Sequence, residues 1–126
     1  MSLLGNLYEI KGRSAAPEGN CCLWTLSLRE DSDVFRGHFP DAPVVPGVAL
    51  IDAVKTLTEK EEARPIEISC IKNAKFLSVL APTDVREISI ALQLSDGTDN
   101  TRRCSSVISS AGHVYAKITI NYRTCI

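Results

Sequence analysis

The sequence lacks a long hydrophobic run and an excess of either charge. No apolar stretch approaches the ~20 residues that a membrane-spanning helix needs, so we expect no membrane insertion. Lysine and arginine together number 14, against 15 aspartate and glutamate residues, which gives a formal net charge of −1. Proteins that bind nucleic acid through its phosphates carry a clear basic excess, so this balance argues against a general nucleic-acid binder.

Paired cysteines are also missing. The chain has five cysteines, which is an odd number, and none of them stands in a CxxC pair. The N-terminus shows no charged stretch followed by a long apolar one, the pattern of a secretory signal. A disulfide framework and a zinc site are therefore disfavoured. We expect a cytoplasmic protein whose thiols are buried as small hydrophobic groups.

What is present is the composition of a globular protein. Of the 126 residues, 44% are hydrophobic and 23% are charged, and no internal repeat is visible. A chain of this length can bury one hydrophobic core. We expect a single domain over residues 1–126.

Alternating apolar and polar residues predict several strands. Residues 22–28 alternate strictly, so that Trp24 and Leu26 face away from Thr25. Similar alternation predicts strands over 7–10, 66–77, 85–94, 102–109 and 113–122, with a loop over 12–19 and a turn over 95–100.

One helix is predicted, over residues 47–61. Its first half is apolar on nearly every side and carries one carboxylate, Asp52, whereas its second half is charged. Since a helix that is apolar all round is usually buried, we expect other structure to wrap the first half and the second half to emerge. Two strands, a buried helix and four further strands predict an α+β fold in which an antiparallel sheet curls around the helix. The sheet edges favour pairing with a second copy.

The segment before the helix carries the most specific motif. Residues 35–52 read Phe-Arg-Gly-His-Phe-Pro-Asp-Ala-Pro-Val-Val-Pro-Gly-Val-Ala-Leu-Ile-Asp. Its three prolines, at three-residue intervals, predict a stiff, non-helical loop around His38. The segment resembles the pattern GHFPxxPxxPGVxxxE or D of the hot-dog-fold beta-hydroxyacyl-acyl carrier protein dehydratases, with every anchor at the same spacing. Residues 75–84 and 109–117 continue the resemblance, which covers most of the chain and implies the hot-dog fold.

Dehydration of a beta-hydroxyacyl thioester needs a base, a donor for the enolate-like oxygen and an acid for the departing hydroxyl. His38 suits the base because the reference pKa of imidazole, ~6.5, lies near working pH. Gly47 begins the helix, where backbone N–H groups are free to bind a carbonyl oxygen. The resemblance implies that His38 takes the alpha proton, that Asp52 serves the hydroxyl and that the Gly47 amide holds the thioester carbonyl. The substrate-binding positions that we expect are Gly47, Val48, Phe39 and Pro46.

Several departures from the family pattern mark a divergent member, among them Asp41 where a Gly is usual. Asp52 stands where most small, single-domain members carry Glu, and the branch that also isomerises the new double bond carries Asp. Lys55-Thr56 replaces the usual Ala-Gln. Isomerase activity therefore stays open, as does the choice between bulk fatty acid synthesis and a specialised acyl or polyene pathway.

The resemblance implies a lyase that converts a (3R)-hydroxyacyl chain on acyl carrier protein to the trans-2-enoyl form, without a metal or an organic cofactor. It also implies a homodimer, with a trimer of dimers left open, in which His38 of one protomer faces Asp52 of the other. Acyl carrier protein is acidic, so its docking surface should be basic. The candidate docking residues are Arg36, Lys72, Lys75, Arg102 and Arg103.

Two other functions fit the same residues. The first is a hot-dog acyl thioesterase, which would release a free thiol. The second is a non-catalytic acyl-binding chain that completes a dehydratase heterodimer.

Overall fold

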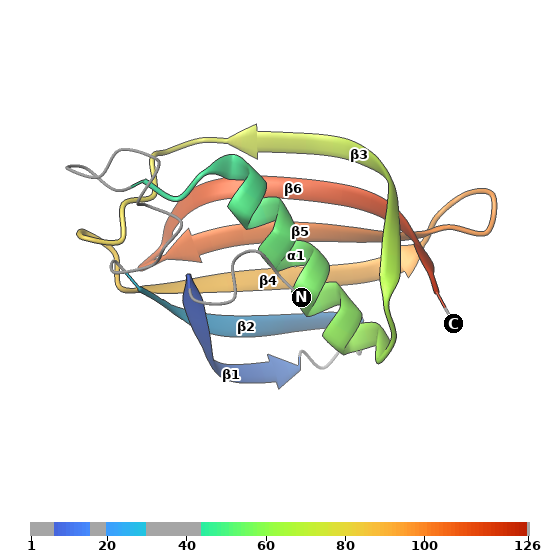
Figure 1. The fold of residues 1–126 in the computed structure, drawn as a ribbon, viewed down its shortest axis with the longest axis horizontal. Helices are drawn as coiled ribbons and strands as arrows, with labels where there is room; N and C mark the ends of the chain where they lie inside the picture. Colours follow the sequence, from blue (N-terminus) through green and yellow to red (C-terminus); the bar gives the residue numbers. More distant parts are fainter. Residues whose placement is uncertain (1–6, 16–19, 30–43, 126) are drawn as a thin grey trace.

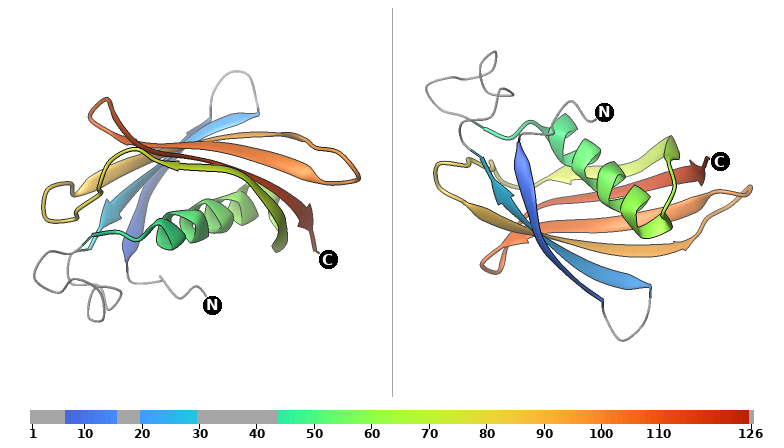
Figure 2. Two further views of the ribbon diagram at one scale, coloured as in Figure 1. Left: turned by 90° about the horizontal axis from the view of Figure 1, so that it is seen from above. Right: turned by 60° about the horizontal axis from the view of Figure 1, so that its bottom comes forward.

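A single curved sheet and one helix make up the described structure. The computed structural model describes residues 7–15, 20–29 and 44–125. Their elements are β1 (Tyr8–Ala15), β2 (Cys21–Leu28), α1 (Gly47–Glu62), β3 (Ile66–Phe76), β4 (Glu87–Asp96), β5 (Arg102–Ser110) and β6 (His113–Thr124). All strand pairs are antiparallel, in the order β1-β2-β4-β5-β6-β3, and α1 crosses the concave face of the sheet (Figures 1 and 2). The predicted wrapping of an antiparallel sheet around one helix is confirmed.

The core forms where the inward faces of the strands meet one stripe of the helix. Along β2, the side chains of Trp24, Leu26 and Leu28 alternate inward and are buried. The buried residues of α1 recur at helical spacing: Ala49, Leu50, Ala53, Val54, Leu57 and Thr58. This stripe packs on buried isoleucines of β4 and β6. The two-residue period of the strands and the helical period of α1 thus determine which side chains face the core.

Strand β1 is longer than the sequence pattern indicated. The predicted loop over 12–19 is wrong for its first part, since β1 runs to Ala15 and stays paired with β2. The register shifts between Ile10 and Gly12, which marks a bulge. The bulge breaks the alternation on which the prediction relied, and backbone pairing with β2 holds a segment that buries little side-chain surface.

The burial of α1 also differs from the expectation. The buried stripe continues through Thr58 in the second half, while Val48 in the first turn is 72% exposed. The expected contrast between a wrapped first half and an emerging second half is therefore wrong. The sheet covers one side of α1 along its whole length, and no described element covers the other. Within the described ranges no helix has the length and apolar content to cross a bilayer.

The five cysteines are free thiols that differ in burial. Cys22 and Cys104 are buried, and burial raises the pKa of each to about 11, which keeps both protonated and unreactive. Cys21 and Cys125 are half-buried and Cys70 is exposed on the edge strand β3, so the expectation of buried thiols is confirmed only for Cys22 and Cys104.

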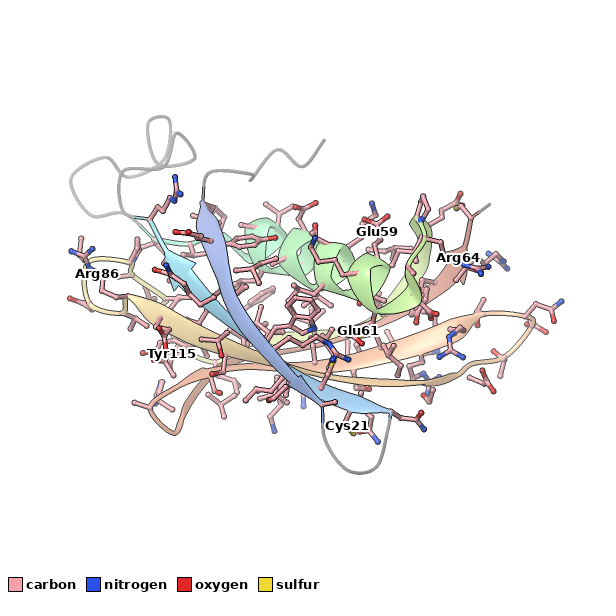
Figure 3. The ribbon with its side chains drawn as sticks, turned by 90° about the horizontal axis from the view of Figure 1, so that it is seen from below. Cys21, Glu59, Glu61, Arg64, Arg86 and Tyr115 are labelled. Carbon is pink, nitrogen blue, oxygen red and sulfur yellow. The ribbon has the colours of Figure 1, made fainter. Side chains whose placement is uncertain are left out.

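Two polar clusters fasten the C-terminal end of α1 to the sheet. In the first, Glu61, which is labelled in Figure 3, accepts two hydrogen bonds from the Arg13 guanidinium. It accepts a third from the Trp24 indole N–H, at 2.9 Å. In the second, Glu62 accepts hydrogen bonds from the Tyr122 hydroxyl and from Arg102. Adjacent glutamates thus reach different halves of the sheet, β1–β2 and β5–β6, and fix the helix axis relative to the sheet.

We predict that Glu61→Ala lowers the free energy of unfolding by about 1–3 kcal/mol, because the Trp24 indole N–H, in a side chain only 8% exposed, loses its acceptor. Arg13 holds the pKa of Glu61 below its usual value. The stability that this pKa shift contributes is therefore present above the unfolded pKa of ~4.3 and is lost as pH falls through the folded pKa. Urea titrations of wild type and variant at neutral and acidic pH measure both effects. Exposed Glu67→Ala is the control, and an equal loss in that variant would contradict the prediction.

Candidate active site

The first turn of α1 has no side-chain cap within the described part of the chain. Pro46 is the N-cap residue, and its carbonyl accepts hydrogen bonds from the amides of Ala49 and Leu50. No acidic residue lies in the first turn. The amides of Gly47 and Val48 precede the first residue that can bond within the helix, so they stand at the positive end of the helix dipole.

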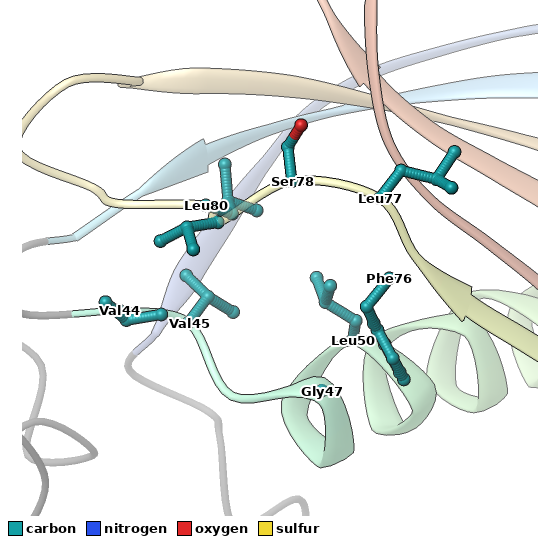
Figure 4. Close-up of a pocket in the computed structure, with 9 residues that line it drawn as sticks. Val44, Val45, Gly47, Leu50, Phe76, Leu77, Ser78 and Leu80 are labelled. Atoms are coloured by element: carbon teal, nitrogen blue, oxygen red, sulfur yellow. The ribbon is translucent and has the colours of Figure 1, made fainter.

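An apolar cavity of about 500 Å³ lies against this helix start. Its lining residues are Val44, Val45, Gly47, Leu50, Phe76, Leu77, Ser78, Val79 and Leu80 (Figure 4). The Val45 amide donates to the Leu80 carbonyl at 2.8 Å, which ties the segment before the helix to the segment after β3. The cavity wall is thus built from two chain segments that are held to each other by backbone hydrogen bonding.

Phe76 packs directly on the helix start. A Cβ atom added to Gly47 would lie 2.8 Å from the Phe76 Cζ, a distance that real Cβ atoms do not adopt. Only glycine allows this approach of ring and backbone. Phe76 is itself half exposed, and Figure 4 shows its ring beside Gly47 and Leu50. An acyl group reaching the Gly47 amide would therefore meet this aromatic ring.

Asp52 lies five residues further along the same helix and is half-buried. Tyr8 on β1 lies near enough to be affected by the charge of Asp52. Burial raises the pKa of Tyr8, the hydrogen bond with Thr56 lowers it, and the charge of Asp52 raises it further. The sequence pattern did not single out Tyr8, because an isolated tyrosine at a strand start is usual in a core.

Only some of the other expected site residues lie together at the start of α1. Pro46 and Gly47 lie together at the helix start, and Gly47 lines the cavity. Val48 is exposed and is not among the lining residues. His38 and Phe39 lie outside the described residues, so the expected approach of His38 to Asp52 stays a prediction.

A serine–histidine pair lies behind the cavity wall. His113 Nε2 and Ser78 Oγ are 2.8 Å apart, and the His113 ring meets Tyr115 edge to face. The Ser78 hydroxyl points away from the cavity in Figure 4. The pair therefore fastens the segment after β3 to the β5–β6 turn and does not face the space that an acyl group would enter. Among the described residues no three metal-ligating side chains come together.

The two edges of the sheet differ in character. Edge strand β1 presents charged residues, including Glu9, Lys11 and Arg13. Edge strand β3 and the segment after it expose large apolar side chains: Ile71, Phe76, Leu77 and Val79. Charges on an edge discourage pairing with another chain, whereas an apolar, uncovered edge favours it.

The basic residues near the cavity belong to β3 and β6. Lys72 and Lys75 are exposed on β3, and Lys75 lies directly opposite Lys117 of β6, which the sequence did not single out. Arg102 is engaged by Glu62 and Asp96, and Arg103 donates to Asn121. Arg36 lies outside the described residues.

Comparisons with known sequences identify the family. Residues 14–113 match the model of the ApeI-like family, described as ApeI dehydratase. Among curated proteins, the 3-hydroxyacyl-[acyl-carrier-protein] dehydratase FabZ of Lactobacillus helveticus is 26% identical, over 94% of this chain and 87% of its own length. FabZ of Rhizobium leguminosarum bv. trifolii is 31% identical, over 86% of this chain and 71% of its own.

Solved structures share the fold at lower identity. The dehydratase heterocomplex ApeI:P from Xenorhabdus doucetiae superposes with a TM-score of 0.73 and 23% identity, over 92% of this chain and 97% of that one. A putative thioesterase, yhdA from Lactococcus lactis, gives 0.65 and 12%, over 98% and 97%. These likenesses confirm the predicted hot-dog fold, but a fold shared by two activities does not choose between them. The family match does choose, since it spans most of the sequence: the chain belongs to the ApeI-like dehydratase family, whose reaction class is that of a hydro-lyase.

Proposed function

We propose that this chain, as one domain, converts a (3R)-hydroxyacyl thioester on acyl carrier protein to the trans-2-enoyl form. The observation that carries the proposal is the start of α1 at Gly47, which has no side-chain cap among the described residues, lies against an apolar cavity and is followed on the same helix by Asp52. The names of the curated FabZ relatives specify the same substrate class. A hydrophobic chain fits the cavity walls, and a thioester carbonyl fits the free amides.

Each step of the reaction has one residue assigned to it. His38 takes the proton from the carbon next to the thioester carbonyl, and negative charge then develops on the carbonyl oxygen. The Gly47 amide stabilises that oxygen, a contribution on the order of 10²–10³ in rate for one well-placed donor. Asp52 gives its proton to the departing hydroxyl, which leaves as water while the carbon–carbon double bond forms.

The site is proposed to be completed by a second chain. The exposed apolar residues of β3 and its following segment lie beside the cavity, and Val48 on the helix start is exposed as well. A partner seated on the β3 edge would cover these side chains and would bring its own His38 loop to the helix start. The solved ApeI relative is itself named as part of a heterocomplex, so the partner is either a second copy or a similar chain.

We predict that wild-type protein forms enoyl product from hydroxyacyl carrier protein, and that His38→Ala and Asp52→Asn each lower kcat by at least ~10²-fold. Mass spectrometry of the carrier protein measures the loss of water. Asp99→Asn, in the β4–β5 turn, is the matched control and should keep full activity. Free thiol without enoyl product would indicate the thioesterase, and a retained acyl ligand without turnover would indicate a non-catalytic binder.

We predict that mixing the two inactive variants restores activity if each site is shared between chains. Random exchange of protomers places one intact site in half of the dimers, so recovery should approach about a quarter of the wild-type rate. The measurement is turnover after co-refolding of His38→Ala with Asp52→Asn. A mixture that exchanges subunits, as shown by mass-tagged chains, and yet stays inactive would place both residues of a site on one chain.

We predict that Lys75→Glu and Lys117→Glu weaken carrier-protein recognition. Each reversal should raise KM for a carrier-protein substrate about fivefold at low salt, and added salt should reduce the difference. The same acyl group on a short pantetheine thiol should show no change in either variant. Lys60→Glu, at the far end of α1, is the control, and an equal effect there would locate docking elsewhere.

A further inference from the structure

One wall of the cavity is a short segment that follows β3 and belongs to no strand, residues 77–80. Backbone hydrogen bonds hold both ends of this wall segment. The amides of Leu77 and Ser78 donate to the Tyr115 carbonyl, at 2.8 and 3.3 Å. At the other end, the Leu80 carbonyl accepts from the segment before α1.

A side-chain hydrogen bond supports the middle of the wall segment. Ser78 Oγ lies 2.8 Å from His113 Nε2, on the side of the wall that faces away from the cavity (Figure 4). Val79, the next residue, is 69% exposed, so side-chain packing holds this part of the wall only weakly. The bond to His113 therefore has a large share in deciding where the wall lies.

His113 is carried by a stiff hairpin. It pairs with Ser110 across the β5–β6 turn, and the two central residues of the turn, Ala111 and Gly112, have positive φ of 50° and 81°. Positive φ at both positions is the geometry of tight two-residue hairpin turns. The Ser110 hydroxyl donates to the Glu87 carbonyl at 2.8 Å, which ties the hairpin to the start of β4. The hairpin can thus serve as a fixed anchor for the wall segment.

Tyr115 places both partners of this hydrogen bond. Its carbonyl accepts the amides of Leu77 and Ser78, and its ring meets the His113 ring edge to face, with centroids 4.6 Å apart. Because the serine backbone and the imidazole ring are both held in place, the bond between them costs little further conformational entropy.

We propose that Ser78 and His113 form a tether that keeps the cavity wide at the start of α1, and that this width determines how broad an acyl group the site accepts. The Ser78 hydroxyl is drawn to the side of the wall away from Gly47 and Leu50 (Figure 4). Apolar walls tend to close on each other, because closure removes apolar surface from water, and the tether opposes this closure. The inference rests on the proposed function, and the two side chains act through the wall segment, not on the reacting atoms.

The position of the wall segment indicates which part of the substrate it meets. It faces the helix start, where the Gly47 amide is proposed to hold the thioester carbonyl. The acyl carbons between the walls are then those nearest the thioester. The tether therefore governs the acceptance of a methyl branch next to the hydroxyl-bearing carbon, and not total chain length.

The test uses two isomeric acyl groups on carrier protein, 3-hydroxyhexanoyl and 3-hydroxy-4-methylpentanoyl, which have the same atoms and differ in breadth. The readout is the ratio of kcat/KM for the straight isomer to that for the branched one. Ser78→Ala and His113→Phe should each raise this ratio about fivefold, since one hydrogen bond is removed and the wall closes. The double variant should raise it no more than either single one. Ser78→Thr keeps the hydroxyl and should keep the wild-type ratio.

Ser110→Ala is the matched control. It removes a hydroxyl bond of the same 2.8 Å length from the same hairpin, but one that leads to β4 and not to the wall segment. The ratio in this variant should stay within about twofold of wild type. A ratio of two substrates does not depend on the folded fraction of the enzyme, so partial unfolding cannot imitate the effect.

The outcomes separate this inference from the function on which it rests. If wild type dehydrates the straight isomer but Ser78→Ala leaves the ratio unchanged or lowers it, the tether is wrong and the function stands. The same holds if wild type rejects the branched isomer outright, or if Ser110→Ala changes the ratio as much as Ser78→Ala does. If wild type dehydrates neither isomer and no longer hydroxyacyl chain, the function and the inference both fail.

Discussion

The packing of one stripe of α1 against the concave face of the sheet is the contact on which the site depends. The stripe determines the rotation of the helix about its axis and hence the direction in which Asp52 and the free amides face. Glu61 and Glu62 set its tilt by reaching β1–β2 on one side and β5–β6 on the other. The cavity lies at the other end of the same helix, where the Val45–Leu80 backbone bond and the Phe76 ring locate the first turn. A shift of the helix by part of a turn would move Asp52 and the Gly47 amide together.

The sequence predicted those parts of the molecule that repeat or that carry fixed spacing. Alternation located β2, β4, β5 and β6 to within a few residues, and the start of α1 at Gly47 was correct. Proline and glycine spacing around His38 supplied the family resemblance, which the comparisons confirmed. Prediction failed where tertiary pairing overrides local pattern. The bulge near Gly12 hid the length of β1, and the exposure of Val48 depends on which side of α1 the sheet covers.

Contacts between distant parts of the chain were also beyond the reach of the sequence. Nothing local relates Glu61 to Arg13 and Trp24, which the fold brings within hydrogen-bonding distance of it. The lysine pair at 75 and 117 arises from strand register, and the engagement of Arg102 by Glu62 arises from the fold of the helix end. The sequence supplies candidate site residues by residue type. Strand register and burial determine which of these residues are adjacent and which already have an ion-pair or hydrogen-bond partner.

The opposed lysines on β3 and β6 have a consequence for the energy of the sheet itself. Lys75 and Lys117 are directly opposite across an antiparallel pair, where like charges repel. No anionic side chain is recorded beside either one among the described residues. The two ammonium groups therefore repel each other in the folded chain. Counterions from solution screen this repulsion. In the docking proposed above, an acidic surface bound at these two lysines would relieve this repulsion, so that binding there and the stability of the sheet would be coupled.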